Sequence, residues 1–249
     1  MLNIVIPMAG LGSRFANEGY KDPKPLIPVH GIPMIKVVVD NLSPSREHRF
    51  IFICQKAHLE KYGLVKKLKS YAKNVEVVVI DKMTEGQVCT ALLAKSYFDN
   101  DDPLMCANAD QFIDFKVDHY LDYIDKNNYD GAIITMKSDD PKWSYAKVDN
   151  RGLVTETAEK KVISEHATVG VFNFSKGKYL VKSAEQMISE NIRVNGEFYT
   201  CPCYNYLIKE KKKIGIYDVG EEYNGMHGLG IPKDLNLFLE NPISRGLKC

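Results

Sequence analysis

Short apolar runs rich in β-branched residues alternate with amphipathic stretches through the first 137 residues of the chain. Runs such as LNIVIPMA and RFIFICQ are apolar at nearly every position, which is typical of strands buried on both faces of a sheet. We predict strands over residues 2–9, 49–55, 75–81, 103–110 and 130–137, and helices over residues 33–42, 57–70, 86–97 and 117–126. Such alternation predicts a parallel sheet covered by helices, because right-handed crossovers connect the strands.

After residue 140 the pattern changes. The stretch YAKVDNRGLVTETAEK predicts a hairpin with a turn at residues 149–152. We then predict strands over residues 166–175 and 214–220, and helices over residues 176–191, 198–211 and from Pro232 onward. No linker-like stretch separates the halves, so we expect one domain over residues 1–249, with halves 1–136 and 137–249. The expected fold class is α/β, with a Rossmann-like, mixed and mostly parallel sheet flanked by helices and a small β-rich subregion.

Positive and negative charges are balanced, with 33 lysine and arginine residues against 32 aspartate and glutamate residues. No overall field therefore draws the chain to nucleic acid or to an anionic membrane. The basic runs at 66–69 and 209–213 lie on a predicted helix face or end, where lysines are solvated or favoured by the helix dipole. No segment reaches the ~20 apolar residues needed to cross a bilayer. We expect neither nucleic acid nor a membrane among the partners.

The N-terminus and the cysteines bear on the cellular compartment. MLNIVIPMAG lacks a basic segment and is interrupted by Pro7, which is unlike a signal peptide. Cys201 and Cys203 form C-P-C rather than C-x-x-C, which is unlike a zinc site. The six cysteines are Cys54, Cys89, Cys106, Cys201, Cys203 and Cys249. We expect free thiols in a cytoplasmic protein.

Ligands of open α/β sheets bind outside the carboxyl ends of the strands. Three loops leave predicted strands at that edge, over residues 9–25, 82–87 and 108–114. In the first loop, Phe15 stands where a dinucleotide-binding loop has its third glycine, and the Walker A pattern is absent. The second strand ends in Cys54-Gln55 rather than in an acidic residue. A dehydrogenase is therefore disfavoured.

The same loop carries two cations suited to phosphate. Gly10 and Gly12 permit close approach of main-chain N–H groups to an anion. Arg14 offers a forked donor that matches phosphate oxygens. Lys24 lies between two prolines, whose fixed φ angles restrict the direction of the chain. A rigid surface loop with a solvated lysine is the alternative interpretation.

GLGSRF followed by PKPL resembles the signature of the sugar-phosphate nucleotidyltransferases, written loosely as G-x-G-x-R…P-K-P. Enzymes of that family join a nucleoside triphosphate to a phosphate monoester and release pyrophosphate. The resemblance implies these two molecules, the second a phosphorylated small-molecule acceptor, as partners, and Mg²⁺ as cofactor with Mn²⁺ as a substitute. It implies Arg14 and Lys24 as catalytic residues. The nucleotide contacts implied in this loop are Met8, Ala9, Gly10, Gly12 and Ser13.

Two further segments match the nucleotide-binding half of the family. TEGQVCTALLA resembles the segment that cradles the base, which implies Gly86 and Gln87 as contacts. An amide such as that of Gln87 donates and accepts, which suits a pyrimidine edge; a helix start capped by Thr84 is compatible with this role. NADQ implies Asn108 as a nucleotide contact and Asp110 as the Mg²⁺ ligand. Magnesium takes most of its ligands from phosphates and water, so one or two carboxylates suffice; a capping role for Asp110 is the alternative.

The acceptor site is implied by two segments of the second half. TAEK resembles the E-K motif of the family, in which lysine holds the phosphate of the acceptor and glutamate contacts the acceptor. The matching residues are Glu159 and Lys160, although a glutamate beside lysines is often only a solvated surface residue. ATVGVFNF resembles the strand that lines the acceptor pocket, which implies Thr168 and Gly170.

Two departures from the family pattern stand out. The family usually ends in a W-x-D-x-G-T-P-E-D-like segment whose first aspartate is a second metal ligand, whereas MHGLGIPKD has Gly228 at that place. His227 and Asp218 are the side chains that the sequence offers instead. In the first loop, ANEGYKD replaces the usual L-T-x-x-x, and we expect it to influence the choice of base and acceptor.

Within the family, the chain resembles the small cytidylyltransferases of bacterial surface-polysaccharide synthesis. This resemblance implies CTP and an acceptor with a phosphorylated amide instead of a sugar 1-phosphate. Two alternatives stay open: an enzyme that makes a nucleotide sugar from UTP, dTTP or CTP, and a non-catalytic nucleotide-binding protein. Small enzymes of this type often pair, so the resemblance allows a homodimer without requiring one.

Overall fold

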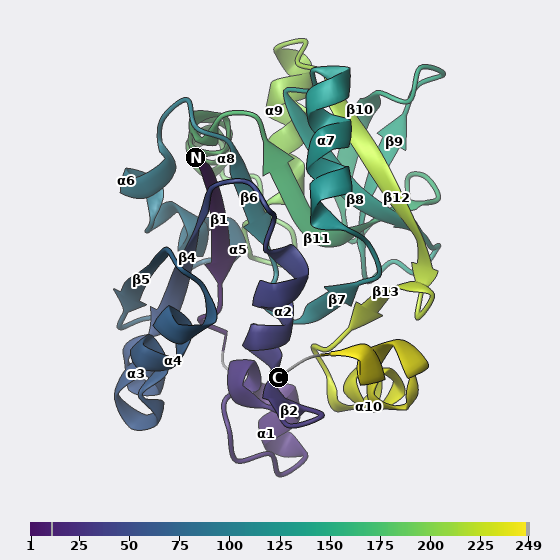
Figure 1. The fold of residues 1–249 in the computed structure, drawn as a ribbon. Coiled ribbons are helices and arrows are strands. Elements are labelled where there is room, and N and C mark those ends of the chain that lie inside the picture. The colour runs from purple at the N-terminus through teal and green to yellow at the C-terminus, as the bar shows by residue number, and fades with distance from the viewer. Residues whose placement is uncertain (11, 248–249) are drawn as a thin grey trace.

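A computed structural model describes residues 1–10 and 12–247. Within these residues, eleven strands form one sheet in the order β5-β4-β1-β6-β11-β8-β12-β13-β7, with β9 pairing to β11 and β10 to β9 (Figure 1). The strands are β1 (Leu2–Pro7), β4 (His48–Gln55), β5 (Val75–Ile80), β6 (Leu104–Ala107), β7 (Gln111–Ile113), β8 (Gly131–Lys137), β9 (Ser144–Val148), β10 (Val154–Glu159), β11 (His166–Phe174), β12 (Ile214–Glu222) and β13 (Gly225–Gly228). A separate small sheet pairs β2 (Pro28–Val29) with β3 (Ile32–Pro33).

Helices connect these strands and cover the sheet. The α-helices are α1 (Ser13–Asn17), α2 (Met34–Leu42), α3 (Lys56–Tyr62), α4 (Leu64–Tyr71), α5 (Gln87–Leu92), α6 (Lys95–Phe98), α7 (Val117–Asn127), α8 (Gly177–Ser189), α9 (Tyr204–Lys209) and α10 (Pro232–Glu240). Three 3₁₀ turns are η1 (Lys24–Leu26), η2 (Cys201–Cys203) and η3 (Pro242–Gly246).

Strands β5, β4, β1 and β6 run parallel to one another, as the β–α alternation predicts. Strand β11 then enters antiparallel between β6 and β8. Strand β12 continues parallel to β8, and β7 closes the order antiparallel to β13. The predicted α/β class with a mixed sheet is therefore confirmed, and the sheet runs through both halves of the sequence.

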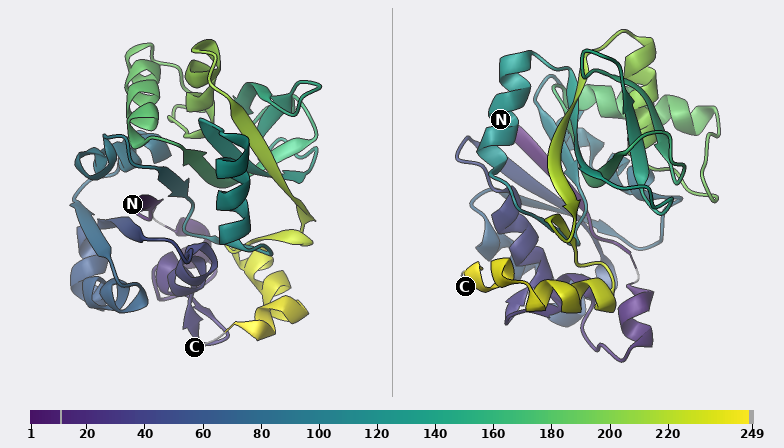
Figure 2. Two further views of the ribbon diagram at one scale, coloured as in Figure 1. Left: turned by 45° about the horizontal axis from the view of Figure 1, so that its top comes forward. Right: turned by 90° about the vertical axis from the view of Figure 1, so that its right-hand side faces the viewer.

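The sheet has an apolar layer on each face. In β1, Ile4 and Ile6 pack on one side with α2, α4 and α7, whereas Val5 packs on the other side with α5, α8 and α9. Figure 2 shows the teal α7 and the purple-blue α2 on one side of the sheet and the green α8 and α9 on the other. This burial on both faces explains why β1 is apolar at nearly every position. A third cluster joins Phe15 of α1 to Leu235 and Phe238 of α10.

Three predicted helices differ from the observed ones. The helix predicted over residues 57–70 is divided at Gly63, whose φ of 58° ends α3 before α4 begins. The helix predicted over 86–97 is divided between α5 and α6. Of the helix predicted over 198–211, only α9 is α-helical, and the 3₁₀ turn η2 with Pro202 precedes it. The short elements α1, β7 and β13 were not predicted, because a few residues carry too little periodicity.

No helix in the described part of the chain is both long and apolar enough to cross a membrane. The five cysteines in that part carry free thiols. The sixth, Cys249, lies outside the described residues.

Candidate active site

A cavity of about 380 Å³ lies at the carboxyl ends of β1 and β6. These strands are parallel neighbours in the sheet, so the loops that follow them meet at one edge. The predicted site residues that line the cavity are Met8, Gly10, Gly12, Lys24, Gln87, Asn108, Asp110, Glu159, Lys160, Thr168 and Gly170. Residues predicted separately for the nucleotide and for the acceptor therefore surround one space.

Lys24 and Asp110 meet on the wall of this cavity. The Lys24 Nζ lies 2.5 Å from Asp110 Oδ2, and about a quarter of each side chain is exposed. Lys24 belongs to η1, which the prolines on either side of it support. Gly12 has a left-handed φ of 65°, and a Cβ there would lie 3.1 Å from the Cβ of Lys24. The turn after β1 can therefore pack closely on the lysine only with glycine at this position.

Four predicted residues do not line the cavity. Arg14 and Ser13 are exposed on α1. Ala9 is buried, and its carbonyl accepts a hydrogen bond of 2.5 Å from Gln55. Gly86 faces the protein, since a Cβ there would lie 2.3 Å from the carbonyl oxygen of Phe198. The structure thus brings Lys24 to the site but leaves Arg14 outside the cavity wall.

The side chains of Thr200, Gln87 and Asn108 form a chain of two hydrogen bonds. The Gln87 Nε2 donates to Asn108 Oδ1 at 2.5 Å, and the Thr200 hydroxyl donates to Gln87 Oε1 at 3.1 Å. Both polar atoms of the Gln87 amide, predicted to face a base, therefore already have protein partners. Thr84 is not the predicted cap of α5, because its hydroxyl donates to the carbonyl of Gly86 instead.

Gly170 allows β11 to lie close to Asn108 in this chain of hydrogen bonds. Its carbonyl accepts a hydrogen bond from the main-chain N–H of Asn108 at 3.0 Å. Its φ is 79°, and a Cβ there would lie 2.1 Å from Asn108 Nδ2. The pairing of β11 with β8 shifts register between Thr168 and Phe172, so the strand is irregular where it passes the cavity.

We expect Gly170→Ala to destabilise the protein. The left-handed backbone contributes about 1–2 kcal/mol and the overpacked contact with Asn108 a further ~1–3 kcal/mol. Gly152→Ala is the matched control, because Gly152 has a φ of 76° and a Cβ added there would meet nothing within 4 Å. Urea denaturation measures the difference. Equal destabilisation by both substitutions would contradict the role given to the Asn108 contact.

Glu159, the last residue of β10, and the following Lys160 also line the cavity. The Lys160 Nζ lies 2.6 Å from the hydroxyl of Tyr199 and 4.7 Å from the centre of its ring. Glu159 accepts a hydrogen bond from the hydroxyl of Ser144. Burial raises the pKa of the Glu159 carboxyl, while the Ser144 hydroxyl and the Lys160 charge oppose that rise to a smaller extent.

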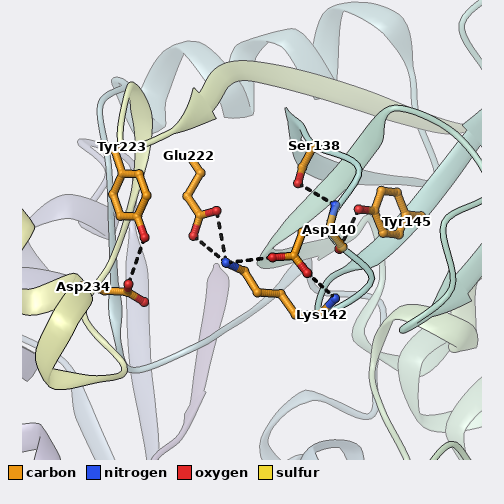
Figure 3. Close-up of polar contacts among 7 residues, drawn as sticks. All are labelled: Ser138, Asp140, Lys142, Tyr145, Glu222, Tyr223 and Asp234. Carbon is orange, nitrogen blue, oxygen red and sulfur yellow. Dashed lines mark hydrogen bonds and ion pairs between the residues drawn. The ribbon is translucent and has the colours of Figure 1, made fainter.

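Sequence reasoning missed several residues of the cavity wall. Lys142, Trp143, Ser144 and Tyr199 all line the cavity. Figure 3 shows the Lys142 ammonium between two carboxylates, 2.9 Å from Glu222 and 3.2 Å from Asp140. No spacing in the sequence links these residues, which come from the loop before β9, the start of β9, the end of β12 and the segment before η2.

Gly228 lies on β13, beside β7. A Cβ at Gly228 would lie 3.2 Å from an Asp234 carboxylate oxygen, and Asp234 accepts a hydrogen bond of 2.9 Å from Tyr223 (Figure 3). His227 and Asp218, which the sequence offers in place of the second metal-binding aspartate, do not line the cavity. His227 is buried beside the rings of Phe112 and Phe238, where burial lowers its pKa. The exposed Asp218 accepts a hydrogen bond from the N–H of Gly220.

The donors present suit a hard cation that is held mainly by its substrates. Residues 1–10 and 12–247 contain no cluster of three or more histidine, cysteine, aspartate or glutamate side chains that could hold a metal ion. Asp110 supplies one carboxylate beside a space large enough for a ligand. Magnesium fits such a site, because phosphate and water oxygens complete its coordination.

The model of the nucleotidyl transferase family matches residues 4–206. The chain therefore belongs to the nucleotidyl transferase family, and the resemblance noted in the sequence is confirmed at that level. The chain is 24% identical over 255 residues to the bifunctional protein GlmU of Methanocaldococcus jannaschii, with 99% of this chain and 56% of that protein covered. The GlmU of Methanococcus vannielii is 25% identical over 252 residues, with coverage of 96% and 56%. The chain thus spans about half the length of these curated relatives.

Solved structures agree with this placement. A nucleoside-diphosphate-sugar pyrophosphorylase from Vibrio cholerae RC9 has a TM-score of 0.82 at 25% identity, with 96% of this chain and 100% of that chain covered. The inositol-1-phosphate CTP transferase from T. maritima has a TM-score of 0.72 at 14% identity, with coverage of 99% and 98%. The second similarity shows the fold alone. The first similarity agrees with the membership in the nucleotidyl transferase family that the family model shows.

Proposed function

We propose that this chain is an Mg²⁺-dependent cytidylyltransferase. It transfers CMP from CTP to a phosphorylated small molecule, L-glutamine phosphate, and releases pyrophosphate, as a step in capsular polysaccharide modification. The observation that carries nucleotidyl transfer is the meeting of Lys24 and Asp110, 2.5 Å apart, in one cavity with Lys160. CTP and the phosphorylated amide rest on the resemblance of the whole sequence to small cytidylyltransferases.

The obstacle to this reaction is charge, because a phosphate dianion must approach the α-phosphorus of a triphosphate. Catalysis of such transfers consists mainly of positioning and electrostatic stabilisation. A phosphate oxygen of the acceptor attacks the α-phosphorus, the bond from that phosphorus to the α–β bridging oxygen breaks, and pyrophosphate leaves. We propose direct displacement with inversion at phosphorus and no covalent intermediate on the protein.

Each charged residue has a separate task in this proposal. Lys24 stabilises the charge that develops on the α-phosphate oxygens. The main chain around Gly10 and Gly12 holds the leaving phosphates, and the Arg14 side chain would have to turn toward them from α1. Asp110 would hold Mg²⁺, which supplies charge neutralisation between the triphosphate oxygens. Lys160 would give up its hydrogen bond to the Tyr199 hydroxyl and bind the phosphate of the acceptor. This would place the attacking oxygen in line with the bond that breaks.

Pyrophosphate release from a panel of nucleotides and acceptors tests the proposal. The panel combines CTP, UTP, dTTP, ATP and GTP with L-glutamine phosphate and glucose 1-phosphate, each with Mg²⁺ or Mn²⁺. We expect CTP with L-glutamine phosphate to have the highest kcat/KM, by about tenfold or more, because a site that hydrogen-bonds one substrate leaves polar groups unpaired with another. No release from any combination would contradict an enzymatic function and favour a non-catalytic nucleotide-binding protein.

A sugar-1-phosphate nucleotidyltransferase is the second candidate. It is favoured by the similarity to the Vibrio cholerae structure named as a nucleoside-diphosphate-sugar pyrophosphorylase. Higher kcat/KM with glucose 1-phosphate than with L-glutamine phosphate would establish this candidate instead. One domain over residues 1–249, a cytoplasmic location and a homodimer remain predictions.

A further inference from the structure

Strand β5 forms one edge of the sheet and has β4 as its single neighbour among the described residues (Figure 1). The N–H of Phe50 in β4 donates to the carbonyl of Asn74, just before β5, at 3.0 Å. Alternate residues of a strand direct their main-chain groups to opposite edges, so the N–H and C=O groups of Val75, Val77 and Val79 point away from the sheet. Residues 1–10 and 12–247 provide no partner strand for these groups.

Strand β5 lacks the features that usually protect an edge. Natural edge strands carry proline, a bulge or several charges, which prevent pairing with another chain. The sequence VEVVVI has no proline and a single charge, Glu76, and its pairing with β4 runs without a register shift. Val79 is 51% exposed. A regular, apolar and exposed edge of this kind favours association with another strand.

The residues that alternate along the free edge are complementary to themselves. With the charges that flank the strand, they are Lys73, Val75, Val77, Val79 and Asp81. In an antiparallel pair centred on Val77, Lys73 of each copy lies opposite Asp81 of the other, and valine lies opposite valine between them. Both flanking residues are exposed. Asp81 also lies 4.0 Å from Lys56, but an ion pair at such exposed positions contributes little and can be exchanged.

We propose that two copies of this chain associate through β5 in this antiparallel register, so that their two sheets become one continuous sheet. The outward-pointing valines would form about six main-chain hydrogen bonds, because each hydrogen-bonded pair of residues exchanges two. The contact is isologous and uses the free β5 edge of each copy, so it closes as a dimer and not as a fibre. This proposal concerns assembly and does not rest on the proposed function.

Analytical ultracentrifugation of the full chain tests the proposal. We expect a monomer–dimer equilibrium at micromolar to millimolar concentration and no larger species. Amide hydrogen exchange should slow at residues 75–80 as the dimer fraction rises, because N–H groups on the free edge become bonded. A monomer at every soluble concentration, open-ended oligomers, or a dimer without this protection would each overturn the proposal.

Val77→Pro separates the pairing of two copies from the folding of one. The N–H of Val77 points to the free edge, where proline is tolerated in a folded monomer. Proline removes both central hydrogen bonds of the dimer, so the dissociation constant should rise about 10-fold or more. Thermal unfolding of the dilute protein checks that the variant is folded. An unchanged dissociation constant in the folded variant would assign the dimer to another surface.

Exchange of the flanking charges tests the register and leaves the main chain intact. Lys73→Asp places like charges opposite each other at both ends of the pair, and the dissociation constant should rise about 10-fold. Adding Asp81→Lys to this variant restores opposite charges and should restore the dimer. Lys147→Asp is the matched control, because Lys147 is exposed on β9, which pairs with β10 and β11. A double variant that associates no better than Lys73→Asp alone would overturn the proposed register.

Discussion

Lys24→Met is expected to lower kcat by about 10²-fold or more, with a smaller change in the KM for CTP. The substitution keeps most of the side-chain length but removes the ammonium that would stabilise charge on the α-phosphate in the transition state. The structure supports this role, because Lys24 Nζ lies at the cavity wall, 2.5 Å from Asp110. Steady-state pyrophosphate release with saturating Mg²⁺ measures the effect.

Lys21→Met is the control for this experiment. Lys21 belongs to the same loop but is exposed and does not line the cavity, so its kcat should stay near that of the unmodified protein. Only about a quarter of the Lys24 and Asp110 side chains is exposed, so breaking this pair is expected to lower stability, unlike the loss of the exposed Lys21. Unfolding midpoints therefore set an assay temperature at which both variants are folded. Near-normal turnover of Lys24→Met would show that the lysine is not catalytic.

Asp110→Asn is expected to raise the Mg²⁺ concentration needed for half-maximal activity and to lower kcat by about 10²-fold or more, since a metal ion contributes several kcal/mol to such transition states. The neutral amide keeps one oxygen but loses the charge that attracts a divalent cation. Among the described residues that line the cavity, no acidic side chain comes from the region of Gly228, so none there could hold the metal in place of Asp110. Activity as a function of Mg²⁺ and of Mn²⁺ measures both effects.

Asp114→Asn supplies the comparison for Asp110. Asp114 follows β7, a few residues further along the chain, but is exposed and does not line the cavity. Its metal dependence should match that of the unmodified protein. Binding of Mn²⁺ to the enzyme–CTP complex, followed by electron paramagnetic resonance, gives a second readout. Unchanged Mn²⁺ affinity in Asp110→Asn would exclude this carboxylate as the ligand.

Much of the fold and part of the candidate site could be predicted from local patterns. Apolar runs predicted β1, β4, β5, β6 and β8, although the edge strand β5 is only partly buried rather than buried on both faces. The loops after β1 and β6 were correctly expected to meet. That expectation depends only on parallel neighbours sharing a carboxyl edge. Lys24 was predicted as a catalytic residue and Asp110 as a metal ligand, and the structure places their side chains in contact.

Other features depended on contacts that are distant in the sequence. Thr200 orients Gln87 across 113 positions, and Lys142 reaches Glu222 across 80. No periodicity connects such residues, so their part in the site was not foreseen. For Arg14 the motif matches the family, but the structure leaves its side chain exposed on α1 and outside the cavity wall.

The sequence by itself determined the β–α order of the first half and the family, because these follow from local periodicity and short motifs. Only the tertiary structure decided that β11 enters antiparallel beside β6, that Gln87 is already engaged, and that Lys142 pairs with Glu222. Strand order and the pairing of charges are set by which distant surfaces pack together. That choice is made by the whole core, and no short segment encodes it.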